Sequence, residues 1–289
     1  MMGVCKRIVL CCLCWQIGIA AWADDSGFVL KEPVVADFNA ILNSQASEVG
    51  VFFYQGRQSI VLIDFPDLSA QGRMFNRLVA LIERIGAPRE RVLSNEELAG
   101  FIRSTGSTES NFAYGNDFLV SELVVFFNLA DLGSVVLTAE ELALRQFLID
   151  QKLMVMRMGF YQALRPRAVV LSLPQVKAPV TPLARRTILA HELAHAEFYT
   201  NAKYAGYCRY FWAKVMSEAE RESFRQFLGR SGYNPENREM MINEMQAYLM
   251  HTPDERAFSP KRLGLNAKQV DALRQKFRDG YPDMVYGGL

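Results

Sequence analysis

A predicted helix that carries the pentapeptide His191-Glu192-Leu193-Ala194-His195 is the feature that most constrains the fold of this chain. Thr181 supplies an N-cap and Pro182 the first helical residue, so the helix is expected to begin there. Histidines four residues apart lie one above the other on a helix face, so both imidazoles can approach one metal ion. The glutamate between them can take a proton from a water molecule beside that ion. The whole chain has only three histidines, so coincidence is a weak explanation of this spacing.

The helix face that holds these histidines is predicted to be buried. Ile188 and Phe198 share this face, whereas Arg185 and Arg186 are expected to point elsewhere. Buried histidines need partners, and a metal ion is one such partner. The alternative interpretation is a helix that carries two histidines on its solvent-exposed side.

The first 23 residues are predicted to be a cleaved signal peptide. Lys6 and Arg7 form a positive start, Ile8–Ala21 is an apolar run that only Gln16 interrupts, and Ala21-Trp22-Ala23 matches a small-x-small cleavage site. Cleavage is expected after Ala23, which makes the protein secreted or periplasmic. The apolar run is short for a transmembrane helix, and an uncleaved membrane anchor is the alternative.

Composition after the predicted signal peptide excludes several function classes. Removing Lys6 and Arg7 lowers the formal net charge by two, from +1 to −1, and no block of basic residues remains. Nucleic acid and anionic membrane surfaces are therefore not expected as partners, and no stable membrane insertion is expected after cleavage. Cys208 is the single cysteine after residue 23, so no internal disulfide is predicted. The sequence gives no indication of the oligomeric state.

Hydrophobic patterning predicts a mixture of helices and strands. Apolar runs on both sides of residues 55–58 predict a β-hairpin, and helical periodicity predicts a helix over 70–85. Capping boxes at Ser94, Thr138 and Ser217 each predict the start of a helix, and Gly232 predicts a break. The remaining expectations are a short helix within 34–46, a loop over 104–117, and an apolar stretch over 118–137 that suits either a helix or a strand.

A short strand is predicted directly before the histidine helix. The run Arg167–Leu173 is apolar and ends at Pro174, which favours a position near the edge of a sheet. The predicted fold class is therefore α+β, with a small mixed sheet whose edge strand precedes the histidine helix. After the signal peptide we expect an α/β lobe over 24–200 and a mainly helical lobe over 201–289.

A strand followed by a helix with H-E-x-x-H resembles the zincin class of zinc metallopeptidases. The resemblance implies one Zn²⁺ per chain and an active-site cleft bordered by the strand before the helix. By the same resemblance, Arg167–Leu173 is the candidate strand with which an extended peptide substrate pairs. The resemblance covers residues 167–200 directly.

A catalytic zinc needs a third protein ligand. The metzincin pattern H-E-x-x-H-x-x-G-x-x-H is absent, because Phe198 stands where its glycine belongs. The run Asn243–Tyr248 resembles the N-E-x-x-S-D helix of the gluzincins, and this resemblance implies Glu244 as the third ligand. Tyr248 replaces the aspartate that orients the first histidine, a role its hydroxyl could fill. The 48 residues between His195 and Glu244 are more than in familiar gluzincins.

The local sequence also favours Glu244 as a ligand. It is the only charged residue between Met240 and Met250, and a carboxylate on a largely apolar helix is costly to bury without a partner or a metal. The alternatives are a solvated Glu244 and the rival ligand His251, seven residues later. Thr252 and Pro253 end the helix there, which favours a solvent-facing or rim position for His251.

These observations predict a zinc metallopeptidase that acts on a polypeptide or peptide substrate. His191, His195 and Glu244 would hold the metal, and Glu192 would be the general base. Tyr248, Tyr199 and His251 are the candidates for stabilising the oxyanion. Two alternatives stay open: a zinc hydrolase with a non-peptide substrate, and a non-catalytic binding protein with a structural zinc site.

Overall fold

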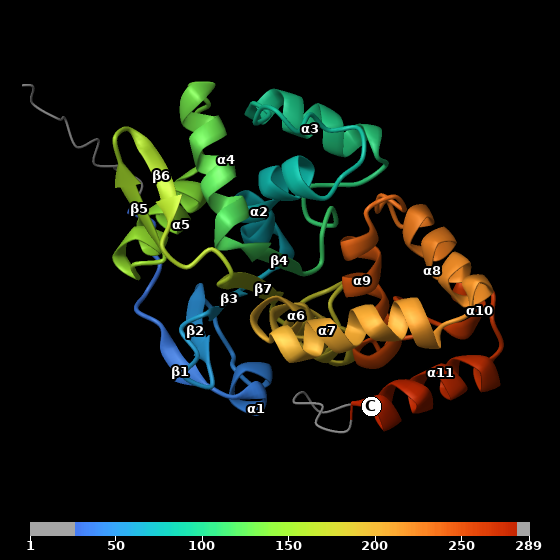
Figure 1. Cartoon of the computed structure of the whole chain (residues 1–289). Helices are drawn as coiled ribbons and strands as arrows, with labels where there is room; N and C mark the ends of the chain where they lie inside the picture. The colour runs from blue at the N-terminus through green and yellow to red at the C-terminus, as the bar shows by residue number, and fades with distance from the viewer. Residues whose placement is uncertain (1–26, 282–289) are drawn as a thin grey trace, which may run out of the picture.

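The computed structural model describes residues 27–281, and the predicted signal peptide lies outside them. Strands and helices alternate in the first part of the chain, and helices alone follow (Figure 1). The predicted α+β class with a small mixed sheet is confirmed. The strands are β1 (Val34–Ala36), β2 (Gly50–Tyr54), β3 (Ile60–Phe65), β4 (Asn116–Leu119), β5 (Met154–Arg157), β6 (Phe160–Ala163) and β7 (Val169–Pro174). The helices are α1 (Phe38–Leu42), α2 (Leu68–Ile82), α3 (Asn95–Ser104), α4 (Val120–Leu132), α5 (Ala139–Asp150), α6 (Pro182–Thr200), α7 (Ala202–Tyr210), the π-helix η1 (Phe211–Val215), α8 (Glu218–Arg230), α9 (Arg238–His251), α10 (Pro260–Leu263) and α11 (Ala267–Gly280).

A five-stranded sheet, in the order β1-β2-β3-β7-β4, forms the centre of the first part. β3 and β7 run parallel, with Ile60 opposite Val169. Every residue of these two strands is buried, and such continuous apolar runs are typical of strands covered on both faces. The predicted hairpin is confirmed, because β2 and β3 are antiparallel and Gln55 and Gly56 turn between them with positive φ.

The prediction that the strand before the histidine helix is an edge strand is wrong. β7 lies between β3 and β4, and β4 is the edge strand beside it. β4 runs antiparallel to β7, with Asp117 opposite Leu171. Pro174 stands at the last position of β7, and a proline at the end of a strand disturbs few ladder hydrogen bonds, so it does not require an edge.

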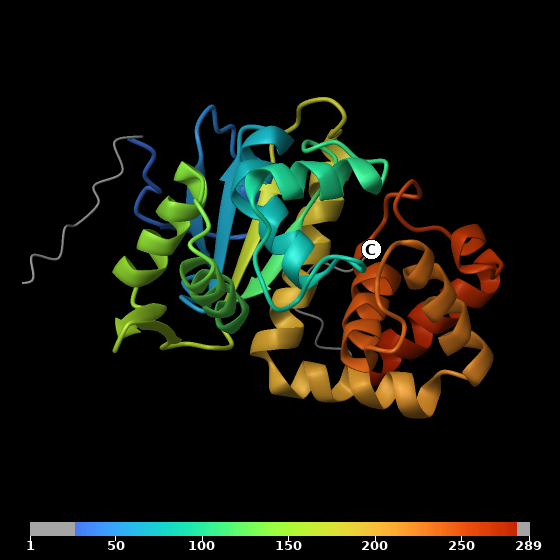
Figure 2. The same cartoon turned by 90° about the horizontal axis from the view of Figure 1, so that it is seen from above.

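The two faces of the sheet support different helices. Helix α2 packs against one face, where Ile63 and Val170 join a large apolar core. Helix α6 packs against the other face, where Leu171 and Leu193 belong to a second apolar cluster. Figure 2 shows α6 between the sheet and the C-terminal helices. The same helix therefore borders both halves of the molecule.

Local sequence predicted several helix starts correctly and missed other elements. Capping boxes at Ser94, Thr138 and Ser217 are confirmed at the starts of α3, α5 and α8. The ambiguous stretch 118–137 contains the end of β4 and then helix α4, and the region 34–46 contains strand β1 before the short helix α1. The β5–β6 hairpin was not predicted. Its turn at Met158 and Gly159, both with positive φ, was the missed indication.

Helix α6 begins as predicted, with the Thr181 side chain accepting from the N–H of Ala184. The prediction that Arg185 points away from the buried face is wrong. Arg185 is 1% exposed, and its Nη1 lies 2.8 Å from Oδ1 of Asp64. This pair joins α6 to β3, so the helix buries a charged contact as well as apolar side chains.

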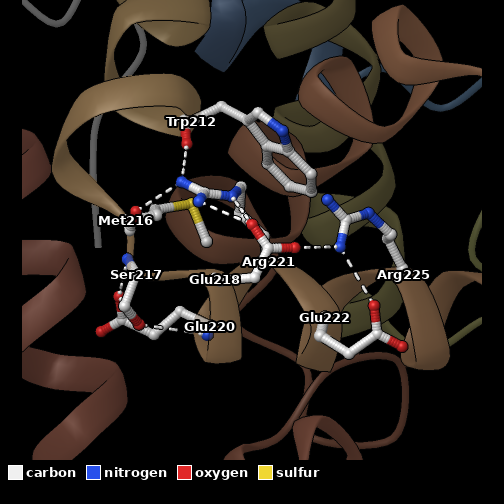
Figure 3. Close-up of polar contacts among 8 residues, drawn as sticks. All are labelled: Trp212, Met216, Ser217, Glu218, Glu220, Arg221, Glu222 and Arg225. Atoms are coloured by element: carbon white, nitrogen blue, oxygen red, sulfur yellow. Dashed lines mark hydrogen bonds and ion pairs between the residues drawn. The ribbon is translucent and has the colours of Figure 1, made fainter.

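The C-terminal helices form a lobe around their own apolar core. The chain passes from η1 into α8 through a turn held by Arg221, which donates to the carbonyl oxygens of Trp212 and Met216 (Figure 3). Gly232 has positive φ just after α8, which confirms the predicted break. The lobe then returns α9 against α6. No helix within 27–281 is long and apolar enough to cross a membrane.

Candidate metal centre

The packing of α9 against α6 brings two histidines and one glutamate together. Nε2 of His191 lies 3.6 Å from Oε2 of Glu244, and Nε2 of His195 lies 3.7 Å from the same oxygen. Ligand atoms about 2.1 Å from a tetrahedral zinc lie about 3.4 Å from one another. The three side chains therefore have the spacing that one small cation requires.

Hydrogen bonds fix the tautomer of His191. Its Nδ1 lies 2.8 Å from Oγ1 of Thr252, and that hydroxyl donates to the carbonyl of Ala247 at 2.9 Å. A hydroxyl has one proton to donate, so Oγ1 must accept the proton of Nδ1–H. Nε2 of His191 is then unprotonated, and its lone pair faces Glu244. Such outer partners commonly set the orientation of metal-binding histidines.

The electrostatics of this cluster favour a cation. Glu244 is 7% exposed, and its Oε2 has no hydrogen-bond partner among the described residues. Burial and the neighbouring His195 lower the pKa of His191 well below its ordinary value, so the ring is neutral. A lone pair on Nε2 and a carboxylate oxygen cannot bond to each other, and buried acceptors that face one another need a positive charge between them. The residues therefore fit a bound metal, and His₂Glu is a ligand set that zinc uses.

A cavity of about 290 Å³ opens on these three side chains and on Glu192. Glu192 is 6% exposed, and its Oε2 also lacks a hydrogen-bond partner among residues 27–281. Burial raises the pKa of Glu192 well above its ordinary value, and Asp117 and Glu244 raise it further. A carboxylate of raised basicity beside the centre is suited to accept a proton.

Gly115 packs directly against Glu192. A Cβ atom at this position would overlap Oε1 of Glu192 and would lie 2.7 Å from Cγ2 of Ile188. Any side chain here would therefore force the Glu192 carboxylate or the chain that enters β4 to shift. The position of the Glu192 carboxylate depends on this absence of a side chain.

Asp117 and Tyr199 complete the wall of the cavity beside Glu192. One carboxylate oxygen of Asp117 lies within 4.8 Å of ligand atoms of Glu192 and His195. Burial, Glu244 and Glu122 raise the pKa of Asp117 above its ordinary value. Asp117 was not predicted as a site residue. It lies at the end of the predicted 104–117 loop. The one feature of the sequence that could have identified it is its position as a single acidic residue directly before an apolar run.

Tyr233 is a second site residue that the sequence did not predict. It lines the cavity, and its hydroxyl lowers the pKa of Glu244, which burial raises. Tyr233 follows the helix-breaking Gly232, but nothing in the sequence places that turn beside α9.

Two predicted catalytic candidates lie outside the cavity lining. The Tyr248 ring packs edge-on against His191, with ring centroids 4.7 Å apart, but Thr252 makes the hydrogen bond that orients this histidine. The prediction that His251 faces solvent or the rim is wrong, because the residue is 4% exposed. Burial, with His191 and His195 nearby, lowers the pKa of His251 to about 3. Thr252 follows His251 at the end of α9, and its side chain contacts His191 on α6. The end of α9 therefore packs against α6, and His251 is buried there. Tyr199 is the oxyanion candidate that lines the cavity.

No model of a protein family matches this chain, and neither a curated protein nor a solved structure resembles it significantly. Function is therefore inferred from the side chains and their geometry.

Proposed function

We propose that this protein is a zinc-dependent peptidase that holds one Zn²⁺ through His191, His195 and Glu244. The observation that carries the proposal is the convergence of three lone-pair donors, of which His195 and Glu244 are buried, beside the unpartnered carboxylate of Glu192. A structural zinc site is commonly closed by four protein ligands, whereas this cluster opens on a cavity. The open side favours a catalytic centre over a structural one.

The residues around the cavity support hydrolysis of a peptide bond. Bound zinc would polarise the scissile carbonyl and acidify an adjacent water molecule. Glu192 accepts a proton from the attacking water and then passes it to the leaving nitrogen. The raised pKa of Glu192 favours the first transfer, because it makes the carboxylate a stronger base. Tyr199, whose side chain lines the cavity, is the candidate donor to the negative carbonyl oxygen.

We assign the pairing of an extended substrate to β4 rather than to β7. Among the strands within residues 27–281, β4 is an edge strand, so no other described strand lies beside its outer N–H and C=O groups. A peptide that adds to this edge gains main-chain hydrogen bonds. Gly115 and Asp117, at the start of this strand, both approach Glu192, so such a peptide would pass the metal centre.

Metal content and hydrolysis, measured on the same sample, test the proposal. The purified protein is stripped with a chelator, reloaded with one equivalent of Zn²⁺, and incubated with an unfolded protein and a peptide library. We expect cleavage only after reloading. Zinc binding without cleavage of any peptide would instead favour a non-peptide substrate or a binding protein, and failure to bind zinc would overturn the metal centre itself.

The proposal also includes export through residues 1–23. The intact mass of the mature protein tests this, because cleavage after Ala23 leaves a chain that begins at Asp24.

A further inference from the structure

The cavity beside the candidate metal centre is lined by more carboxyl groups than basic groups. Six of its lining residues are carboxylates and two are arginines. Glu192 and Glu244 belong to the proposed centre, and Glu239 pairs with Arg209, whose Nη2 lies 2.9 Å away. Half of the acids are therefore not used by the centre or by this ion pair.

The three remaining carboxylates come from three elements that meet beside α6. Glu83 caps the C-terminus of α2, Asp117 lies on β4, and Glu122 lies in the first turn of α4. Within residues 27–281, no lysine or arginine forms an ion pair with any of them. Arg167, the second arginine of the lining, donates its Nε to the carbonyl of Tyr199 instead.

A second observation points to a ligand with donor groups. Glu192 is 6% exposed and lines the same cavity, and its Oε2 has no hydrogen-bond partner among the described residues. A carboxylate oxygen of Asp117 lies within 4.8 Å of a Glu192 oxygen and of a His195 nitrogen. A positively charged group with N–H donors next to the scissile bond would satisfy this side of the cavity.

We propose that Asp117, together with Glu83 and Glu122, binds the α-ammonium group of a peptide, so that the enzyme releases N-terminal residues. This proposal rests on the peptidase function above. The α-nitrogen of a residue lies about 2.5 Å from its own carbonyl carbon, whereas the charge of a lysine side chain lies several ångströms farther away. Asp117 lies within 4.8 Å of Glu192 and His195, and this short distance suits the α-ammonium group better than the ammonium group of a lysine side chain. Hydrolysis breaks the first amide C–N bond, adds the water oxygen to the carbonyl carbon, and leaves the proton on the departing nitrogen.

The test compares matched ligands on zinc-loaded protein. Peptides of one sequence are supplied with a free N-terminus, with an acetylated N-terminus, and acetylated with lysine before the scissile bond; products are identified by mass. Wild type, Asp117→Asn and the control Glu96→Gln, an exposed acid on α3, are compared after zinc content and folding are checked. Binding of alanine hydroxamate and of its N-acetyl form is measured by calorimetry, which needs no turnover.

We expect wild type and Glu96→Gln to cleave the free peptide with at least about tenfold higher kcat/KM than the acetylated one. Asp117→Asn should lower kcat/KM for the free peptide by about 10–100-fold more than for the acetylated peptide, the size expected for a charged hydrogen bond. Equal cleavage of both peptides by wild type, or equal loss on both in Asp117→Asn, would overturn the proposal. Preference for the acetylated lysine peptide would assign the charge to a side chain and would also overturn it. If no peptide is cleaved, the peptidase proposal fails, and equal calorimetric affinity for the two hydroxamates would then reject the ammonium site as well.

Discussion

Thr252 accepts a hydrogen bond from Nδ1 of His191 because its own hydroxyl proton is donated to the carbonyl of Ala247. This relationship links the end of α9 to the centre of α6, and it presents Nε2 of His191 as a lone pair. The helix that supplies Glu244 therefore also orients the first histidine. The candidate metal centre and the packing of α9 on α6 depend on each other.

The first prediction concerns this hydroxyl. Thr252→Val keeps the shape of the side chain but removes the acceptor, so Nδ1–H of His191 loses its partner. We expect zinc affinity to fall by about 10–100-fold, as for other outer partners of metal-binding histidines. Thr252→Ser keeps the hydroxyl and should retain affinity within a few-fold. Competition with a chelator of known affinity measures both variants; equal affinities for valine and serine would refute the role of the hydroxyl.

The second prediction concerns the general base. Glu192→Gln preserves the size of the side chain but cannot accept a proton, so the variant should fold, bind zinc and lose about 10²–10⁴-fold in kcat. The measurement is turnover of a peptide that wild type cleaves, with bound zinc determined on the same sample. Undiminished turnover would exclude Glu192 as the base.

Local patterns in the sequence were sufficient to place the centre of the site. His191 and His195 are four residues apart on one helix, and Thr181 is the N-cap of that helix. Both features depend only on residues that are close together in the sequence. Glu244 was found because one charge stands out on an otherwise apolar helix. For these residues, the neighbouring few positions in the sequence were enough for the prediction.

Residues that join the site through long-range packing could not be predicted. Asp117 reaches the site because β4 adds antiparallel to β7, and strand order is not encoded by periodicity within one strand. Arg185 has the charge of a surface residue, yet Asp64 on β3 gives it a buried partner. The edge position was assigned to the wrong strand for the same reason.

The third prediction separates Glu244 from His251. Glu244→Ala removes a ligand atom that lies 3.6 Å and 3.7 Å from the two histidine nitrogens, so the variant should lose bound zinc. Because metal binding and folding are linked, its unfolding midpoint should no longer respond to added zinc. His251→Ala should lower stability, since the ring is buried, but should keep one zinc per chain. Metal analysis of both variants decides the matter: zinc lost only without His251 would reverse the assignment.

The fourth prediction concerns the buried ion pair between α6 and β3. Arg185→Met leaves the carboxylate of Asp64 buried without its cation, and we expect a loss of about 3–5 kcal/mol in the free energy of unfolding. The neighbouring Arg186 is exposed, so Arg186→Met should change this free energy by no more than about 0.5 kcal/mol. Urea unfolding of both variants is the measurement, and similar stabilities would show that the buried pair contributes little.

The last prediction concerns Gly115, which is not one of the proposed metal ligands. A methyl group at this position overlaps Oε1 of Glu192, so Gly115→Ala must displace that carboxylate or the start of β4. Displacement of a base by about 1 Å can cost about 10²-fold in rate, so kcat should fall steeply while bound zinc stays at one per chain. Gly206→Ala is the matched control, because a Cβ on this glycine of α7 meets no atom within 4 Å, and it should leave kcat unchanged. A fully active, zinc-loaded Gly115→Ala variant would mean that the position of Glu192 tolerates the added methyl group, and the close approach of α6 to β4 would then not matter for catalysis.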